Sequence, residues 1–249
     1  MGELYPGVKE RSDFKKRFEA FIASDEATHG LFELSDDILT YKTEVFASDR
    51  IDDRPALLLL LGNPASHSVA SGWCFAFEKS GSEHRFWKVL REVGILTFFD
   101  QGSNEARREA LWKLQYSSPF RVSIAVFYSI PSPASDPDWS GVSGVRRLLG
   151  ARAFRAITIY EQKRIQSLVS RFISPAGGIL AFQKDAYNGV RSQDSPAYSR
   201  EQANQGLLVG KYRLDENIHL AGSPPTRVMQ SERSKQVLEK HKNWLLAGH

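Results

Sequence analysis

Apolar residues in this chain fall into short continuous runs that alternate with stretches of helical spacing. The run ALLLLL at residues 56–61 ends at Gly62, which predicts a strand buried on both faces of a parallel sheet. Strands alternating with helices predict a three-layer α/β/α sandwich around a mainly parallel, four-stranded sheet. The other predicted strands are 122–128, 179–182 and 218–221, and the predicted helices are 12–24, 84–93, one capped by Asn104, 154–173 and 231–246.

The pattern predicts one domain over residues 1–249. We expect a helical extension over residues 1–50, a surface insertion loop over the polar stretch 188–210, and a closing helix over 229–247. In open α/β sheets, ligands bind beyond the carboxyl ends of the strands. The loops that follow the four predicted strands, after Leu61, Tyr128, Phe182 and Ala221, are therefore the places where we expect a site.

Composition narrows the class of protein only slightly. The net charge of +4 and the pI near 9.1 permit an anionic partner but do not require one. A single cysteine, Cys74, excludes an internal disulfide and fits a reducing compartment. The N-terminal residues 1–11 lack a secretory apolar segment, and the longest apolar run is too short to span a bilayer. We expect a monomer without membrane association, located in a bacterial-type cytoplasm or with the nucleoid.

A loop rich in small side chains, GNPASHSVASGWCFA at residues 62–76, directly follows the first predicted strand. Asn63 leaves the strand, Pro64 fixes the turn, and Phe75 returns an aromatic ring twelve positions after Asn63. Small residues let a backbone approach a ligand, and an aromatic ring provides a surface for stacking. The competing interpretation is structural, because Asn often caps turns and most Phe side chains lie in cores.

This loop resembles motif 1 of the uracil-DNA glycosylase superfamily, and is most similar to the mismatch-type uracil/thymine-DNA glycosylases. Those proteins carry Asn-Pro-small after a strand and a Gly-aromatic-X-Phe segment at the same spacing. Three further segments follow in the same order, so that the resemblance covers residues 56–230. These segments are 85–90 (RFWKVL), similar to an Arg-Phe-Trp helix, 183–187 (QKDAY), similar to Gly-Lys-X-Ala-Tyr, and 222–227 (GSPPTR), similar to motif 2.

The resemblance implies an enzyme that flips uracil out of DNA and hydrolyses its glycosidic bond, leaving an abasic site. It implies that Asn63 positions the attacking water, which gives slower chemistry than an Asp would. It also implies that Phe75 stacks on the extracted base. Pro64, Ala65 and His67 belong to the same loop and are candidate substrate-binding residues, and His84 is expected to be an exposed helix start.

Two positions depart from the family pattern. Ser223, the second candidate catalytic residue, stands where relatives carry His or Asn, and its shorter hydroxyl cannot become cationic. Phe127 and Tyr128 stand where many relatives place a base-reading Asn, so we treat both as candidate substrate-binding residues. The resemblance further implies a DNA-binding set drawn from the Pro/Ser-rich loop and from the end of motif 2, namely Ser132, Pro133, Ser135, Pro225, Thr226 and Arg227, with Arg227 as the wedge.

The sequence lacks the cysteine spacing of a zinc or iron–sulfur site and the Gly-rich loop of a nucleotide site, so we expect neither metal nor cofactor. Two alternatives remain open: a protein that binds abasic or damaged DNA with little catalysis, and a glycosylase for mismatched thymine, hypoxanthine or xanthine. One of two basic clusters is a candidate phosphate-binding surface, although a solvated helix face is the favoured interpretation of each cluster taken alone. Their members are Arg146, Arg147, Arg152 and Arg155, and Arg233, Lys235, Lys240 and Lys242.

Overall fold

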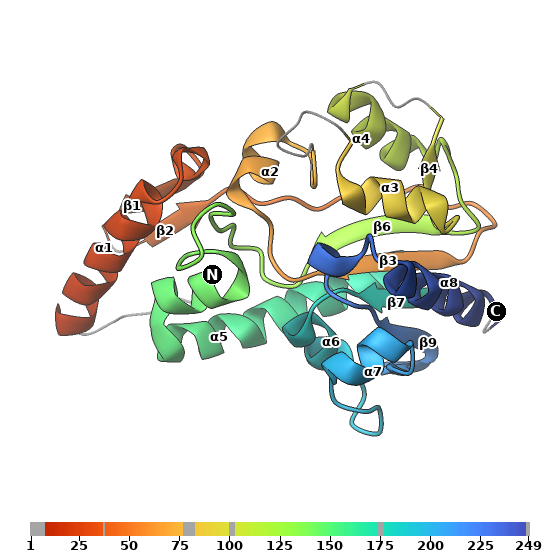
Figure 1. The fold of residues 1–249 in the computed structure, drawn as a ribbon. Coiled ribbons are helices and arrows are strands. Elements are labelled where there is room, and N and C mark those ends of the chain that lie inside the picture. Colours follow the sequence, from red (N-terminus) through yellow and green to blue (C-terminus); the bar gives the residue numbers. More distant parts are fainter. Residues whose placement is uncertain (1–7, 37, 77–82, 100–102, 174–176, 248–249) are drawn as a thin grey trace. The chain divides into compact units, whose positions relative to one another are not determined.

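A computed structural model describes residues 8–36, 38–76, 83–99, 103–173 and 177–247, and their secondary structure is that of an α/β protein. The chain divides into two compact units, each built from three separate stretches. Unit 1 contains Met1–Glu44, Asn63–Cys74 and Tyr128–Lys163, and unit 2 contains Val45–Gly62, Phe75–Phe127 and Arg164–His249. Figure 1 labels most of their helices and strands.

Unit 2 contains the main sheet, in the strand order β6-β3-β7-β9-β8. The first four of these strands run parallel, as the sequence predicts. The expected number of four strands is wrong, because β8 adds an antiparallel edge strand to β9. The strands are β3 (Ala56–Leu61), β6 (Arg121–Val126), β7 (Gly177–Ala181), β8 (Val209–Tyr212) and β9 (Asp215–Gly222).

Burial on both faces explains why the central strands read as continuous apolar runs. Every residue of β3 is buried, and so is every residue of β7. A Cβ on Gly178 would lie 2.5 Å from the Leu245 side chain, and one on Gly177 would lie 2.5 Å from the Ile173 side chain. Successive residues of a strand point to opposite faces, so helical segments pack closely on both sides of β7. This matches the layered arrangement expected from the sequence.

Helices of unit 2 flank the sheet (Figure 1). The region 188–210, expected to be a loop, contains α7 and leads into β8, so that expectation is wrong in part. A short pair, β4 (Thr97–Phe98) and β5 (Tyr116–Ser117), was also not predicted. The helices are α3 (Arg85–Glu92), α4 (Asn104–Lys113), α6 (Lys184–Val190), α7 (Arg200–Gln205) and α8 (Glu232–Ala247), with the 3-10 turn η2 at Thr226–Val228.

Unit 1 is organised around aromatic packing. Phe21 is fully buried, and its ring meets Phe32 edge-on at 5.4 Å and Trp139 at 5.7 Å. The expected helical extension over residues 1–50 also contains a hairpin, because residues 32–41 pair as two antiparallel strands. The elements are α1 (Val8–Ala23), η1 (Glu26–Thr28), β1 (Phe32–Ser35), β2 (Ile38–Tyr41) and α2 (Ser66–Ser71).

The longest helix, α5 (Gly141–Phe172), begins thirteen residues earlier than the pattern predicts. It is two helices joined at a kink, because Gly150 has φ 77° and ψ 164°. Such a φ suits glycine, which has no Cβ to clash with the backbone. Residues 141–163 of α5 belong to unit 1 and residues 164–172 to unit 2.

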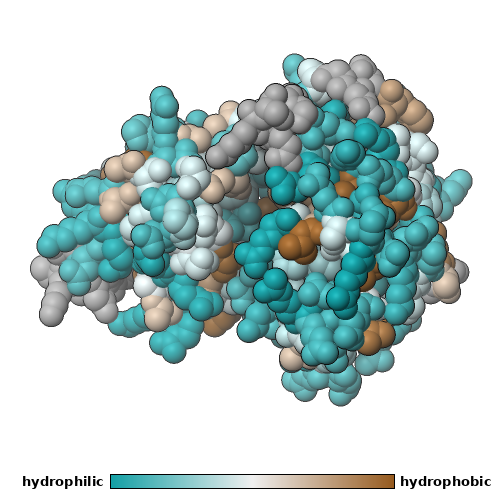
Figure 2. Space-filling view, viewed as in Figure 1, coloured by the Kyte–Doolittle hydropathy of each residue, from teal (hydrophilic) through white to brown (hydrophobic). Residues whose placement is uncertain are grey.

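The surface seen in Figure 2 is largely hydrophilic, with apolar residues in small separate areas. Among the described residues, none of the helices combines the length and the apolar character needed to cross a membrane.

Candidate functional site

The carboxyl ends of β3, β6, β7 and β9 lie at one edge of the sheet of unit 2, because these strands are parallel. Asn63 follows β3 by two residues, and Ser223 follows β9 directly. Two of the three stretches of unit 1 also begin just after strands: Asn63–Cys74 after β3, and Tyr128–Lys163 after β6. The loops that the sequence marks as candidates therefore do follow the ends of parallel strands.

Within unit 1, the amide of Asn63 is held by three acceptors. Its Nδ2 group donates to the Ser132 hydroxyl oxygen at 2.8 Å, and to the carbonyl oxygens of Pro64 and Ile130, both at 3.3 Å. Carbonyl oxygens only accept hydrogen bonds, so the two carbonyls fix which end of the amide faces them. Among the described residues, none donates to Asn63 Oδ1. This oxygen therefore remains as an acceptor for a water or a ligand.

The backbone around Asn63 is joined to the Pro/Ser-rich loop in the manner of a short parallel ladder. Ser132 N–H donates to Pro64 O at 3.0 Å, and Ser66 N–H donates to Ser132 O at 2.9 Å. Ala65 and Ser132 form the corresponding bridge. Two segments that are far apart in sequence, both singled out as candidates, are thus brought together at Asn63.

His67 lies on the short helix α2 and is exposed. The helix ends at Gly72, whose φ of 69° lies in the left-handed region. A glycine here lets the chain turn back, so that Trp73 N–H donates to Ser68 O at 3.2 Å. Trp73 and Cys74 are then buried.

A half-buried acid, Glu44, lies close enough to Cys74 for its charge to affect the thiol. Burial raises the pKa of Glu44 to about 8, and Oε2 of this side chain is buried without a hydrogen-bond partner among the described residues. Burial, and then the charge of Glu44, raises the pKa of the Cys74 thiol well above its usual range. Glu44 belongs to no motif in the sequence, so only the folded structure could indicate its unusual environment.

The Pro/Ser-rich loop is fixed at both of its ends within unit 1. The buried carboxylate of Glu161 accepts the Ser129 N–H at 2.7 Å, and Ser129 Oγ lies 2.7 Å from the Tyr41 hydroxyl. At the other end, Ser135 is exposed and its hydroxyl donates to Asp25 at 3.0 Å. The loop geometry therefore depends on Tyr41, Asp25 and Glu161, none of which the sequence indicated.

The candidate DNA-binding residues of this loop differ in accessibility. Ser132 and Pro133 are buried, whereas Ser135 is exposed. The Ser132 hydroxyl accepts a hydrogen bond from Asn63. Its position therefore suits orienting the candidate catalytic amide better than it suits binding a DNA phosphate.

Phe75, in unit 2, is half-buried in an aromatic cluster. Its ring stacks on Phe86 at 4.4 Å and 26°, and lies 4.8 Å from the His84 ring. Its carbonyl accepts the Trp87 indole N–H at 2.9 Å. Phe75 has a left-handed φ of 50°, an uncommon conformation for an aromatic residue. These contacts hold the ring in one orientation. His84 caps α3 as predicted, with its Nδ1 accepting the Phe86 N–H at 3.1 Å, although it is half-buried and not exposed.

Ser223 is fully buried in unit 2 at the end of β9. Its hydroxyl donates to Pro224 O at 3.1 Å, and its N–H donates to Ala181 O at 2.8 Å. The side chain is thus satisfied by its own neighbour. Farther along the chain, Pro225 and Thr226 are half-buried and Arg227 is exposed.

Phe127 and Tyr128, considered for substrate binding, are buried in different units. In unit 2, Phe127 packs so closely on Gly189 that a Cβ there would lie 2.2 Å from the Phe127 ring. In unit 1, the Tyr128 ring lies 4.9 Å from the Phe154 ring and its hydroxyl 3.2 Å from Thr158 Oγ1. Both positions are those of core residues.

Many basic side chains of the two clusters already have partners. In unit 1, Arg147 pairs with Asp138 at 2.9 Å, and Arg146 lies over the Phe154 ring. In unit 2, Lys235 pairs with Glu92 at 2.9 Å, and Lys242 donates to Val93 O at 2.7 Å. The described residues contain no group of three or more His, Cys, Asp or Glu side chains arranged to hold a metal ion.

No protein-family model matches the chain, and no match is found among curated proteins.

The structure therefore sorts the candidate residues into two groups. Unit 1 contains Asn63, Pro64, Ala65, His67 and Ser132 in one connected region, and the remaining residues of the Pro/Ser-rich loop adjoin it. Unit 2 contains Phe75, Ser223 and the segment with Arg227.

Proposed function

We propose that the protein is a monofunctional DNA glycosylase that flips uracil out of DNA and hydrolyses its glycosidic bond. Under this proposal the protein acts as a monomer, needs no cofactor, and works in a bacterial-type cytoplasm or on the nucleoid. The proposal rests on the resemblance of residues 56–230 to the uracil-DNA glycosylase superfamily, and on one observation at the first of its motifs.

That observation is the fixed orientation of the Asn63 amide. Its Nδ2 group is committed to Pro64 O, Ile130 O and the Ser132 hydroxyl, and Oδ1 accepts no hydrogen bond from the described residues. A residue that only capped a turn would not need its nitrogen held from three sides. A pre-oriented carbonyl oxygen is suited to accept a hydrogen bond from an attacking water.

The proposed reaction is a hydrolysis. The bond between C1′ and the uracil nitrogen breaks, and its electron pair leaves with the base. Water attacks C1′ while it donates one hydrogen bond to Asn63 Oδ1, and the proton that water loses ends on the departing base. Because an amide is a weak base, Asn63 orients the water without removing its proton, which implies slow turnover.

From unit 2, the proposal draws on Phe75 and Arg227. The Phe75 ring is fixed by Phe86 and retains exposed surface, which suits stacking on a base. Arg227 is exposed on the η2 turn, where its long side chain suits insertion into the gap left by a flipped nucleotide.

A second candidate function is the binding of abasic or damaged DNA with little catalysis. The observation that favours it is the state of Ser223, which is fully buried with its hydroxyl bonded to Pro224 O. A group in this state is poorly placed to stabilise the negative charge on a departing base. Removal of another base, such as mismatched thymine, hypoxanthine or xanthine, is an alternative substrate range for the same reaction.

The test uses labelled duplexes that contain U:G, U:A, T:G or hypoxanthine, followed by alkaline cleavage of abasic sites. The protein is compared with Asn63→Ala and with Asn243→Ala, which removes an exposed amide from α8. We expect uracil excision that falls at least tenfold in Asn63→Ala and is unchanged in Asn243→Ala.

Other outcomes separate the alternatives. Tight binding to an abasic-site duplex without base release would support the binding protein. Release of only thymine or hypoxanthine would change the substrate and keep the reaction. Full activity in Asn63→Ala would overturn the role given to this residue.

A further inference from the structure

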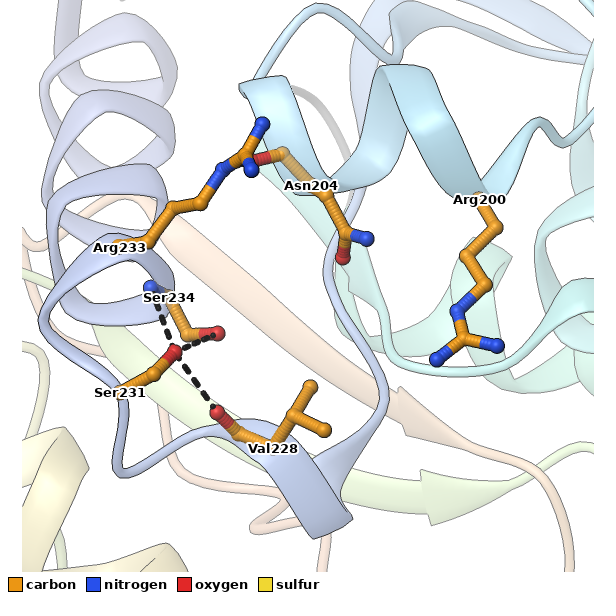
Figure 3. A pocket seen from close by; sticks show the side chains of 6 residues that line it. All are labelled: Arg200, Asn204, Val228, Ser231, Arg233 and Ser234. Atoms are coloured by element: carbon orange, nitrogen blue, oxygen red, sulfur yellow. Dashed lines mark hydrogen bonds between the residues drawn. The ribbon is translucent and has the colours of Figure 1, made fainter.

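A small pocket in unit 2 lies where α7, the η2 turn and the start of α8 meet (Figure 3). Its volume is about 140 Å³. The side chains that line it are basic or neutral, namely Arg200, Asn204, Val228, Ser231, Arg233 and Ser234. The absence of a carboxylate from this lining makes the pocket suited to an anion.

The two arginines come from different helices and both are exposed. Arg233 Nε donates to Asn204 O at 2.9 Å, which fixes the plane of the guanidinium. Among the described residues, neither terminal nitrogen of Arg233 makes a hydrogen bond or ion pair, and Arg200 makes none through its side chain. One held and one unengaged guanidinium group, both with unused N–H donors, are well suited to bind phosphate oxygens.

Carboxylates near the pocket are engaged elsewhere. Glu232 pairs with Lys235 at 2.9 Å, and Glu201 accepts a hydrogen bond from Gln205 at 3.4 Å. Neither therefore competes directly for the arginines.

Two serine hydroxyl groups, those of Ser231 and Ser234, also line the pocket. The Ser231 hydroxyl lies 2.8 Å from the Ser234 hydroxyl and accepts the Ser234 N–H at 3.2 Å. Figure 3 shows this pair at the first turn of α8, beside Val228. The partial positive charge at the start of a 16-residue helix adds to the field of the two arginines.

We propose that this pocket binds a phosphate group, and that its source is a backbone phosphate of DNA. The choice of DNA as the source rests on the function proposed above. Val228, one of the lining residues, directly follows Arg227 in the chain. A phosphate bound in the pocket would therefore hold the DNA backbone beside the proposed wedge residue. Such a contact positions DNA without reading its sequence.

The experiment measures binding of a fluorescent, uracil-free duplex by anisotropy at several salt concentrations. The protein is compared with the Arg200→Gln/Arg233→Gln double variant and with Arg213→Gln, which removes an exposed charge elsewhere in unit 2. We expect the double variant to bind about tenfold more weakly and to lower the slope of log K against log salt by about 0.9, the value for one phosphate contact. Arg213→Gln should leave the slope unchanged. Thermal melting checks that both variants remain folded.

Titration with inorganic phosphate in a calorimeter distinguishes the two sources of phosphate. If the double variant loses phosphate binding but retains the salt slope with DNA, the pocket holds a free phosphate and the assignment to DNA is overturned. If neither ligand distinguishes the double variant from Arg213→Gln, the pocket is not a phosphate site.

Measuring uracil excision by the same proteins tests the phosphate pocket and the proposed glycosylase function independently. If the unmodified protein excises no uracil but the double variant has a lower salt slope, the phosphate pocket is supported and the glycosylase function is overturned. If excision depends on Asn63 but the double variant keeps the salt slope, the glycosylase function is supported and the phosphate pocket is overturned.

Discussion

The side-chain amide of Asn63 donates a 2.8 Å hydrogen bond to the hydroxyl of Ser132, a residue 69 positions farther along the chain. This bond links the loop after β3 to the Pro/Ser-rich loop after β6. It also gives the candidate catalytic residue a defined orientation that depends on a second, buried residue.

Ser132→Ala should reduce uracil excision about fivefold, because the amide loses one buried acceptor worth about 1 kcal/mol. The two carbonyl acceptors remain, so activity should not be abolished. Single-turnover kinetics measure the effect, and Ser170→Ala, on an exposed part of α5, is the matched control. Equal rates for the two variants would show that Ser132 does not position Asn63.

Asn63→Asp should destabilise the protein by about 1–3 kcal/mol and should not accelerate the reaction. A carboxylate is a stronger base than an amide, but one of its oxygens would face the carbonyls of Pro64 and Ile130. Urea unfolding and single-turnover excision measure the two effects. A stable and faster variant would contradict the amide orientation described above.

Glu44 should make the protein less stable as the pH rises. Burial raises its pKa from 4.5 to about 8, so between these values the folded state holds a proton that the unfolded state has lost. This contribution is fully present below pH 4.5 and is lost as the pH rises through 8, at up to about 1.4 kcal/mol per pH unit. Urea unfolding between pH 5.5 and 8.5 should show the decline. The slope should be smaller in Glu44→Gln and unchanged in Glu216→Gln, an exposed control.

Cys74 should react very slowly with a thiol reagent in the native state. It is buried, and burial raises the pKa of its thiol, so little thiolate is exposed to the reagent. Because the chain has one cysteine, absorbance after addition of an aromatic disulfide reports this residue alone. We expect one thiol per chain to appear on unfolding in guanidinium. Rapid reaction without denaturant would show that residues 63–74 open readily.

Phe127→Leu should lower stability by about 1 kcal/mol and leave the KM for uracil-containing DNA unchanged. Its ring is fully buried against Gly189, so packing and not substrate contact is affected. Gly189→Ala should destabilise the protein more, and Phe127→Leu should partly restore it by making room. A raised KM in Phe127→Leu with unchanged thermal stability would instead support the substrate-binding role considered from the sequence.

The sequence predicted the parts of the fold that depend on strong local patterns. The run at residues 56–61 is buried on both faces, which is why β3 was evident. β8 was missed because most of its four residues are only half-buried and carry no clear alternation. The beginning of α5 was missed because Gly141, Gly144 and Gly150 interrupt its helical pattern, and Gly150 indeed kinks the helix.

For the candidate site, the sequence indicated the loops but not the state of each side chain. Asn63 and Ser132 were both identified, yet their mutual contact depends on two strands lying side by side. Ser223 was a candidate catalytic residue, but the path of the chain after β9 buries it. Burial of Glu44 likewise follows from tertiary packing, which a single polar residue in a linker does not reveal.

The three-stretch composition of unit 1 has a consequence for folding. Its parts, Met1–Glu44, Asn63–Cys74 and Tyr128–Lys163, must meet across intervening segments that belong to unit 2. Closing such long loops costs chain entropy before the contacts form, so unit 1 should be assembled late and slowly. During synthesis, Asn63 leaves the ribosome well before Ser132 exists, and the candidate catalytic amide acquires its orientation only after more than half of the protein has been made.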